Sequence, residues 1–286
     1  MPARARSSRA LRCRRYRRLS ARTLFLSLRK LHIHHAQRAG ADFGRLFALA
    51  IVGLCARAPA VAGPSDYVVT PIVEEGEREI DFKAGSAKLR DGSRESKQSL
   101  GLGLGVNSWW FTEFYAVWHK PPGERHSFDA WEWENKFQLT ETGRYPVDLG
   151  VLLEIERPKD RSEGYELRWG PLLQAEIGTQ VQANLNLLLE RQLRSAAGGS
   201  TELGYQWQLK YRWRPALEWG AQGFGNLGPW RDWLPASQQS HTAGPALFGR
   251  IDLGPRKVVK YNAGLLFGLN HASPANTLRV QTEFEF

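Results

Sequence analysis

The stretch Leu203-Gly-Tyr-Gln-Trp-Gln-Leu-Lys-Tyr-Arg-Trp-Arg214 alternates strictly between two kinds of side chain. Its odd positions are all apolar or aromatic, and its even positions are glycine, glutamine, lysine or arginine. Successive side chains of an extended strand point to opposite faces, so the segment has one apolar and one polar face. Its length is close to what a tilted strand needs to cross a bilayer. The stretch therefore predicts a membrane-crossing strand.

The same alternation recurs from Glu77 to the C-terminus, and no segment there has convincing helical periodicity. An even number of strands is what bacterial single-chain barrels require, and we predict about twelve, with ten as the alternative. The sequence thus predicts an all-β fold, a closed antiparallel transmembrane β-barrel over residues 77–286. The expected strands are 78–86, 98–106, 109–118, 127–140, 146–156, 164–177, 180–191, 202–213, 216–225, 241–253, 257–269 and 277–286.

The connections between these segments support the barrel independently. Counted from the first, the odd-numbered connections are long and carry Gly, Pro and charged residues, as in 226–240. The even-numbered ones are mostly tight turns, as in Asn107-Ser108. Long connections of outer-membrane barrels face the cell exterior and short ones face the periplasm. With residues 63–76 as a periplasmic N-terminal segment, every long connection falls on the extracellular side.

The positive charge of the chain belongs to its N-terminal region. Of the 39 Lys and Arg residues, 13 lie in residues 1–45 with one of the 29 acidic residues, which leaves 26 basic against 28 acidic residues beyond them. The net charge of +10 therefore indicates no nucleic-acid partner for the rest. The apolar run 46–56 has the length of a signal-peptide core. Because Ala60-Val61-Ala62 follows it, we expect a Sec-type signal peptide that is cleaved before Gly63, removing residues 1–62.

Both cysteines, Cys13 and Cys55, lie in that leader. Cleavage before Gly63 would leave a mature chain without a thiol or a disulfide. No two histidines outside the leader have the spacing of a ligand pair on a strand or helix, so we predict no metal site. No cofactor motif is present, and we expect no cofactor.

Near the C-terminus, Leu278, Val280, Thr282, Phe284 and Phe286 share one face of the expected last strand, and charged or amide residues share the other. This strand resembles the closing strand of bacterial outer-membrane proteins, and Val280, Phe284 and Phe286 carry the resemblance. The resemblance implies that these three residues form an assembly signal for the barrel-assembly machinery. It also implies periplasmic chaperones as partners during biogenesis, and the lipid of the outer membrane as the final environment.

A periplasmic or secreted β-sandwich is the alternative fold, since alternation can also mark a core face. The expected outer face of the strands argues against it because it is rich in aromatic residues. Tyr and Trp near strand ends are typical of the interfacial girdles of membrane proteins. These residues are Trp131, Trp133, Tyr165, Trp169, Tyr205, Trp207, Tyr211, Trp213 and Trp219.

The polar faces predict a charged lumen with an acidic wall on the earlier strands and a partly basic wall on the later ones. Such a field across a narrow pore orients charged or dipolar solutes, as in porin constrictions. In a barrel of this size the charges could instead pair across the lumen and fill it, and both interpretations stay open. The residues predicted to line the lumen are Glu113, Glu132, Glu134, Lys136, Glu154, Glu156, Glu166, Arg168, Glu190, Lys210, Arg212, Arg214, Arg250, Lys260 and Arg279.

We therefore expect a small passive channel, a porin-like protein for small solutes, in the outer membrane. A non-conducting barrel with a structural or adhesive role is the alternative. An outer-membrane lipid hydrolase is the least favoured function, although His271-Ala272-Ser273 has the spacing of the nucleophilic pair in outer-membrane phospholipase A, with Asn270 or Asn276 nearby. The triplet precedes Pro274 and falls in an expected loop, so we predict no catalytic residue.

Overall fold

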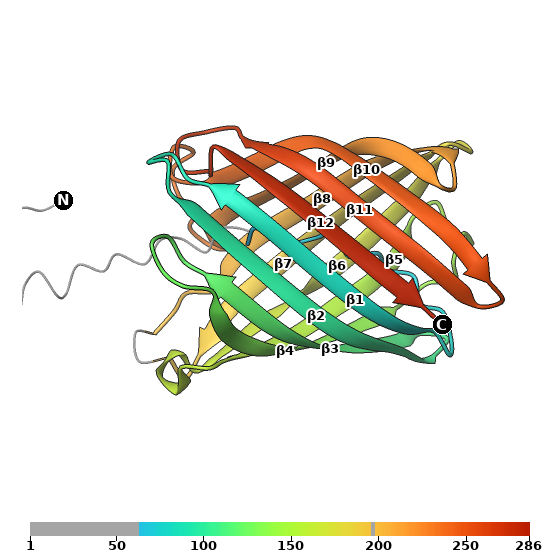
Figure 1. The fold of residues 1–286 in the computed structure, drawn as a ribbon, viewed down its shortest axis with the longest axis horizontal. Helices are drawn as coiled ribbons and strands as arrows, with labels where there is room; N and C mark the ends of the chain where they lie inside the picture. The colour runs from blue at the N-terminus through green and yellow to red at the C-terminus, as the bar shows by residue number, and fades with distance from the viewer. Residues whose placement is uncertain (1–62, 196–197) are drawn as a thin grey trace, which may run out of the picture. The chain divides into compact units, whose positions relative to one another are not determined.

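A computed structural model of the chain describes residues 63–195 and 198–286. Twelve antiparallel strands form one closed barrel in which every strand pairs with its neighbours in sequence, and β1 pairs with β12 (Figure 1). The predicted fold class and strand number are confirmed. The strands are β1 (Arg78–Lys88), β2 (Arg94–Asn107), β3 (Trp110–Lys120), β4 (Ser127–Gln138), β5 (Asp148–Pro158), β6 (Tyr165–Ile177), β7 (Val181–Leu193), β8 (Glu202–Arg214), β9 (Leu217–Pro229), β10 (Ser240–Gly254), β11 (Lys257–Gly268) and β12 (Asn276–Glu285).

Helical structure is nearly absent from the described residues. A single 3₁₀ turn, Arg161–Glu163, lies between β5 and β6, and the Asp160 side chain caps it by accepting a hydrogen bond from the Ser162 backbone N–H. In residues 63–195 and 198–286, no helix has both the length and the apolar character needed to cross a membrane. The predicted signal peptide and cleavage site lie outside the described residues.

The two ends of the barrel differ in their connections. We call the end at which β1 begins and β12 ends the turn end, and the opposite end the loop end. Turn-end connections include 108–109, 178–180, 215–216 and 255–256. The predicted contrast in length has two exceptions. The first loop is only 89–93, because β1 and β2 stay paired as far as Lys88 and Arg94. The turn-end connection 139–147 is long.

The outer surface of the barrel is apolar. The outward positions of β2 carry Leu100, Leu102 and Leu104, and Leu102 is 66% exposed. Large exposed apolar side chains recur on the other strands, among them Trp131, Leu187 and Val280. A soluble monomer rarely exposes apolar surface so continuously, and a lipid environment removes its cost.

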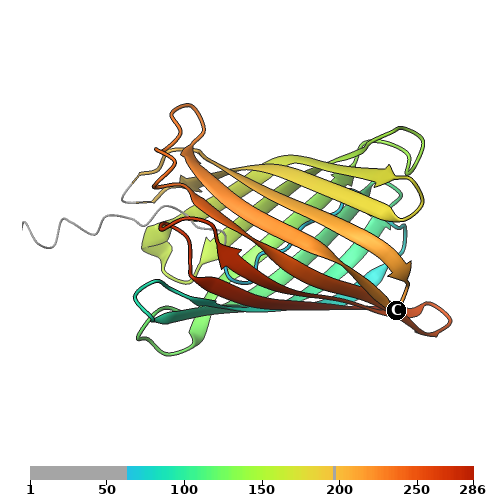
Figure 2. The ribbon, with the colours of Figure 1, turned by 90° about the horizontal axis from the view of Figure 1, so that it is seen from above.

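Residues 63–76, predicted to be a periplasmic N-terminal segment, lie inside the barrel (Figures 1 and 2). The segment begins beside Lys97 and Gly85, passes Pro71 against Gly150, and turns at Gly76 into β1. Gly76 has φ of 77°, a left-handed conformation that glycine adopts without strain. We call residues 63–76 the luminal segment.

A charge on the lipid-facing surface provides a test of the membrane orientation. Leu187 lies in the middle of β7 and Leu193 at its end, and both are exposed on the outer face. We expect Leu187→Arg to destabilise the folded barrel by about 2–4 kcal/mol and Leu193→Arg by no more than about 1 kcal/mol, because the cost of a charge falls toward the bilayer surface. Urea unfolding in lipid vesicles measures both values, and equal costs would contradict the assigned orientation.

Candidate functional site: the barrel lumen

Tyr67 holds the luminal segment in the centre of the barrel. Its phenol oxygen donates to the carboxylate of Glu134 on β4, at 3.1 and 3.0 Å from the two oxygens. Its ring lies over the ammonium group of Lys83 on β1, with Nζ 3.5 Å from the ring centroid. The ring of Tyr115 on β3 covers the same ammonium group at 3.7 Å. Lys83 is therefore enclosed between an aromatic ring of the segment and one of the wall, an arrangement that cation–π attraction stabilises.

Lys83 also forms a deeply buried ion pair. Its Nζ lies 3.5 Å from Oδ2 of Asp81, and the two side chains are 5% and 2% exposed. Tyr115 donates a hydrogen bond of 2.8 Å to the same oxygen of Asp81. A charge this far from water needs a close counter-charge and hydrogen bonds, and this cluster supplies both.

The backbone of the luminal segment is held by side chains and by one wall strand. Asn186 Nδ2 donates to the carbonyl of Val69 at 3.0 Å, and the N–H of Val73 donates to Oε1 of Gln138 at 2.7 Å. At the turn end, Gly105 on β2 accepts from the N–H of Gly76 and donates to the carbonyl of Glu77. These bonds meet the requirement that buried backbone groups be paired.

Apolar wall residues pack against the segment at its centre, and we call this contact the grip. Val69 packs against Leu152, Leu172 and Leu188, which come from three adjacent strands and point inward. Val68 packs in the same way against Phe224 and Leu266. These inward residues would face water in an empty lumen, so the wall is built to bury them against the segment. Leu152 interrupts the alternation of its strand in the sequence, and this contact is the reason.

The luminal segment leaves one cavity on each side of the grip. A cavity of about 470 Å³ lies toward the turn end, and one of about 230 Å³ lies toward the loop end. Between them, next to Tyr67 and Val69, the space shrinks to about 30 Å³. The lumen is thus open to small molecules from both ends and closed in the middle.

Ion pairs within and between strands line the rest of the lumen. Arg168 on β6 contacts three carboxylates, Glu154 at 3.3 Å, Glu166 at 3.8 Å and Glu190 at 3.5 Å. Lys97 lies 3.5 Å from Glu156. In the later strands Lys210 pairs with Glu218 at 3.2 Å. Some of these pairs join neighbouring strands, whereas Lys97 on β2 reaches Glu156 on β5. The lumen therefore combines the two predicted alternatives, because its charges are paired and cavities remain between them.

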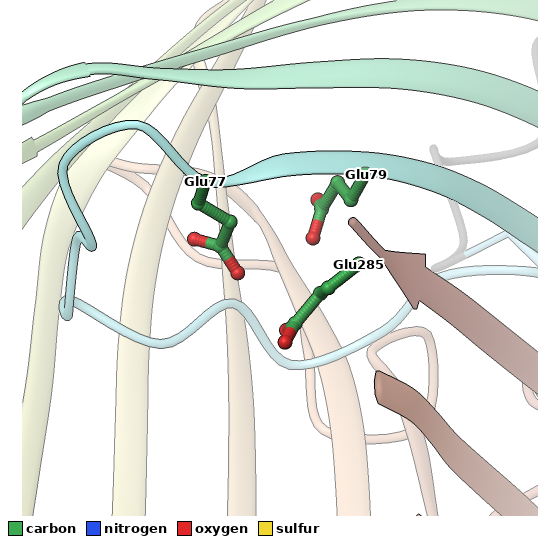
Figure 3. A group of neighbouring side chains, drawn as sticks. All are labelled: Glu77, Glu79 and Glu285. Carbon is green, nitrogen blue, oxygen red and sulfur yellow. The ribbon is translucent and has the colours of Figure 1, made fainter. Parts of the chain in front are cut away.

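At the turn end, carboxylates meet across the seam where the barrel closes. Glu77, Glu79 and Glu285 bring carboxylate oxygens within 4.8 Å of one another (Figure 3). Glu79 and Glu285 are direct partners in the β1–β12 register. The ammonium group of Lys260 lies 3.5 Å from Glu77 and contacts Glu285. Like charges directly opposite in a sheet repel, and Lys260 is the counter-charge that offsets this repulsion.

The predicted lining residues lie mostly on these cavity walls. Arg214 does not: it is exposed at the end of β8, where the register with β9 shifts, and its guanidinium lies over the ring of Trp213 at 4.5 Å. Arg279 is buried, with its guanidinium over the ring of Phe224 at 4.7 Å, and it borders none of the three cavities. The residues on cavity walls are Glu113, Glu132, Glu134, Lys136, Glu154, Glu156, Glu166, Arg168, Glu190, Lys210, Arg212, Arg250 and Lys260.

The serine of the hydrolase-like triplet has a structural environment. Ser273 is 2% exposed, and its hydroxyl donates to the side chain of Asn270 at 2.6 Å. It also bonds to the backbone of His241, whereas His271, two residues before it, is exposed. Ser273 therefore stabilises the loop end, and within residues 63–195 and 198–286 its hydroxyl has no contact with an imidazole ring, which a nucleophilic pair requires.

Comparisons with known proteins address the fold. No protein-family model matches the sequence. No curated protein matches it either. Among solved structures, the chain is similar to the COG4313 outer membrane channel from Pseudomonas putida F1, with 10% identity, a TM-score of 0.52 and coverage of 77% of this chain and 98% of that one. The fold is that of a bacterial outer-membrane β-barrel.

Two further solved structures match with lower TM-scores. A NanC porin matches with 11% identity and a TM-score of 0.49, over 72% of this chain and 100% of that one. The outer membrane phospholipase A from Escherichia coli matches with 11% identity and a TM-score of 0.37, over 73% of this chain and 92% of that one. Likeness at these scores carries no argument about activity.

Proposed function

We propose that this protein is a passive channel of the bacterial outer membrane for small solutes, with a preference for cations. The observation that carries the proposal is the pair of cavities, of about 470 and 230 Å³, that enter the lumen from its two ends. A purely structural barrel needs no such space. The turn end is assigned to the periplasm and the loop end to the cell exterior.

The preference for cations follows from the charges on the cavity walls. The loop-end cavity is bordered by six carboxylate side chains, including Asp66 and Glu156, and by three basic ones, Lys97, Arg168 and His119. The turn-end cavity has eight acidic and five basic side chains on its wall. A path with excess negative charge concentrates cations and repels anions.

Planar-bilayer recordings with the purified protein test this function. In a potassium chloride gradient we expect discrete conductance steps and a reversal potential on the cation-selective side. The selectivity should weaken as the ionic strength rises, because salt screens the wall charges. Anion selectivity would contradict the charge argument. The absence of conductance steps across salts and voltages would contradict the proposed channel function.

A non-conducting structural barrel is the second candidate, and one observation favours it. The centre of the lumen is closed by Tyr67, Val68 and Val69, whose contacts leave about 30 Å³ there. The two candidates differ in what this segment does: a permanent filling supports a structural role, and a removable one supports a channel.

A further inference from the structure

We propose that residues 63–76 are a removable plug, anchored by Tyr67 and hinged at Gly76, whose withdrawal toward the turn end opens the channel. The inference rests on the proposed channel function. It is carried by the way the luminal segment is attached to the wall.

The segment is joined to the barrel at one end only. Its C-terminal end continues into β1 at the turn end, and the paired bonds of Gly105 with Gly76 and Glu77 fix that point. Gly63, at the other end, lies within the lumen beside Lys97. With the predicted cleavage before Gly63, this inner end carries no further chain. The segment can then leave through the turn end without threading through a closed loop.

The attachments inside the lumen are side-chain contacts and not sheet pairing. No residue of the segment belongs to a strand, and its backbone bond with the sheet is the one between Gly76 and Gly105 at the turn end. The segment is held by the Tyr67 contacts, by the packing of Val68 and Val69, and by the two hydrogen bonds that Val69 and Val73 make with wall side chains. Water-accessible cavities lie on both sides of this grip. A chain held by side-chain contacts between two hydrated spaces can detach without breaking the sheet.

Two inward glycines show that the wall is shaped to receive the segment. A Cβ added to Gly85 on β1 would lie 1.8 Å from the carbonyl oxygen of Pro64, and its three nearest atoms all belong to the segment. A Cβ on Gly105 would lie 2.0 Å from the carbonyl oxygen of Glu74. Gly85 does not have a positive φ, so alanine fits its backbone. An alanine at Gly85 therefore collides with the plug while leaving the wall strand intact.

The test compares an unseated plug with a locked one. Gly85→Ala should raise the ratio of open to closed channel by about tenfold or more in planar bilayers, which is the effect of a modest destabilisation of one state. Gly204→Ala is the matched control: it adds the same methyl group to a glycine on the loop-end cavity wall, where the nearest atom is 3.4 Å away and belongs to β9. We expect the control to behave as the wild type.

The lock is a disulfide between the plug and β5. An ideal Cβ on Gly150 lies 2.9 Å from Cβ of Pro71, close enough for the roughly 3.8 Å of a disulfide after a small shift. The double variant Pro71→Cys/Gly150→Cys should be closed when oxidised and should conduct after reduction with dithiothreitol. The two natural cysteines precede residue 63 and do not interfere after cleavage.

A second readout follows the plug without conduction. Val68 is 6% exposed and borders the turn-end cavity. In a Val68→Cys background, maleimide labelling should be about tenfold faster with Gly85→Ala than with Gly204→Ala. Equal labelling, or full conductance of the oxidised lock, would overturn the removable plug and leave the channel standing. Faster labelling with no conductance in any variant would overturn the channel function instead.

Discussion

Replacing Lys83 with methionine should destabilise the folded barrel by about 3–5 kcal/mol, because loss of one partner from a buried ion pair leaves the other charge uncompensated. The carboxylate of Asp81, with a side chain 2% exposed, would lose the ammonium group 3.5 Å away. Methionine keeps most of the apolar stem between the rings of Tyr67 and Tyr115. The midpoint of urea unfolding in detergent, followed by the heat-dependent gel shift of barrels, measures the loss.

The double variant Lys83→Met/Asp81→Asn separates the electrostatic cost from the packing cost. It removes both charges and keeps the hydrogen bond from Tyr115 to position 81, so most of the lost stability should return. A double variant as unstable as Lys83→Met would show that the aromatic enclosure of the ammonium group, and not the unpaired carboxylate, sets the cost.

The barrel could be predicted from the sequence because its signal is local and repeated. In residues 203–214 the polarity of each side chain indicates the face of the strand on which it lies. The predicted strand 202–213 agrees within one residue with β8, Glu202–Arg214. Strand ends were less predictable. β2 begins at Arg94, four residues before the predicted start, because Lys88 and Arg94 continue the pairing beyond the apolar part of the strand.

The sequence predicts which residues face the lumen, and it does not predict the contacts that they make there. Alternation places Glu154, Arg168 and Glu190 on the inner face, but their contact depends on the register of β5, β6 and β7. Arg214 is the last residue of β8, where the register with β9 shifts, and it is exposed outside the three cavities.

The luminal segment was missed because it carries no alternation of its own, and its partners lie far away in the sequence. Tyr67 and Glu134, for example, are 67 residues apart. One signal was present: Leu152, Leu172 and Leu188 occupy inward positions at which a water-filled lumen would favour polar residues. Apolar residues on the polar face of several neighbouring strands indicate that something apolar fills the lumen at that level.

Arg168 is the site of the second large effect that we expect. Its guanidinium lies within 4 Å of Glu154, Glu166 and Glu190, which come from three adjacent strands. Arg168→Met would leave the three carboxylates close together, and the side chain of Glu154 is 4% exposed. We expect a loss of about 3–5 kcal/mol in the free energy of unfolding at neutral pH. The same urea titration measures it.

Arg212→Met is the matched control, because it removes a guanidinium from a more exposed pair. Arg212 and Glu176 lie 2.7 Å apart with side chains 40% and 35% exposed, and such pairs contribute no more than about 1 kcal/mol. Distance alone would rank this pair above the contacts of Arg168, whereas burial ranks it below. If Arg212→Met costs as much as Arg168→Met, burial does not govern the ion pairs of this lumen, and its interior is as hydrated as an open pore.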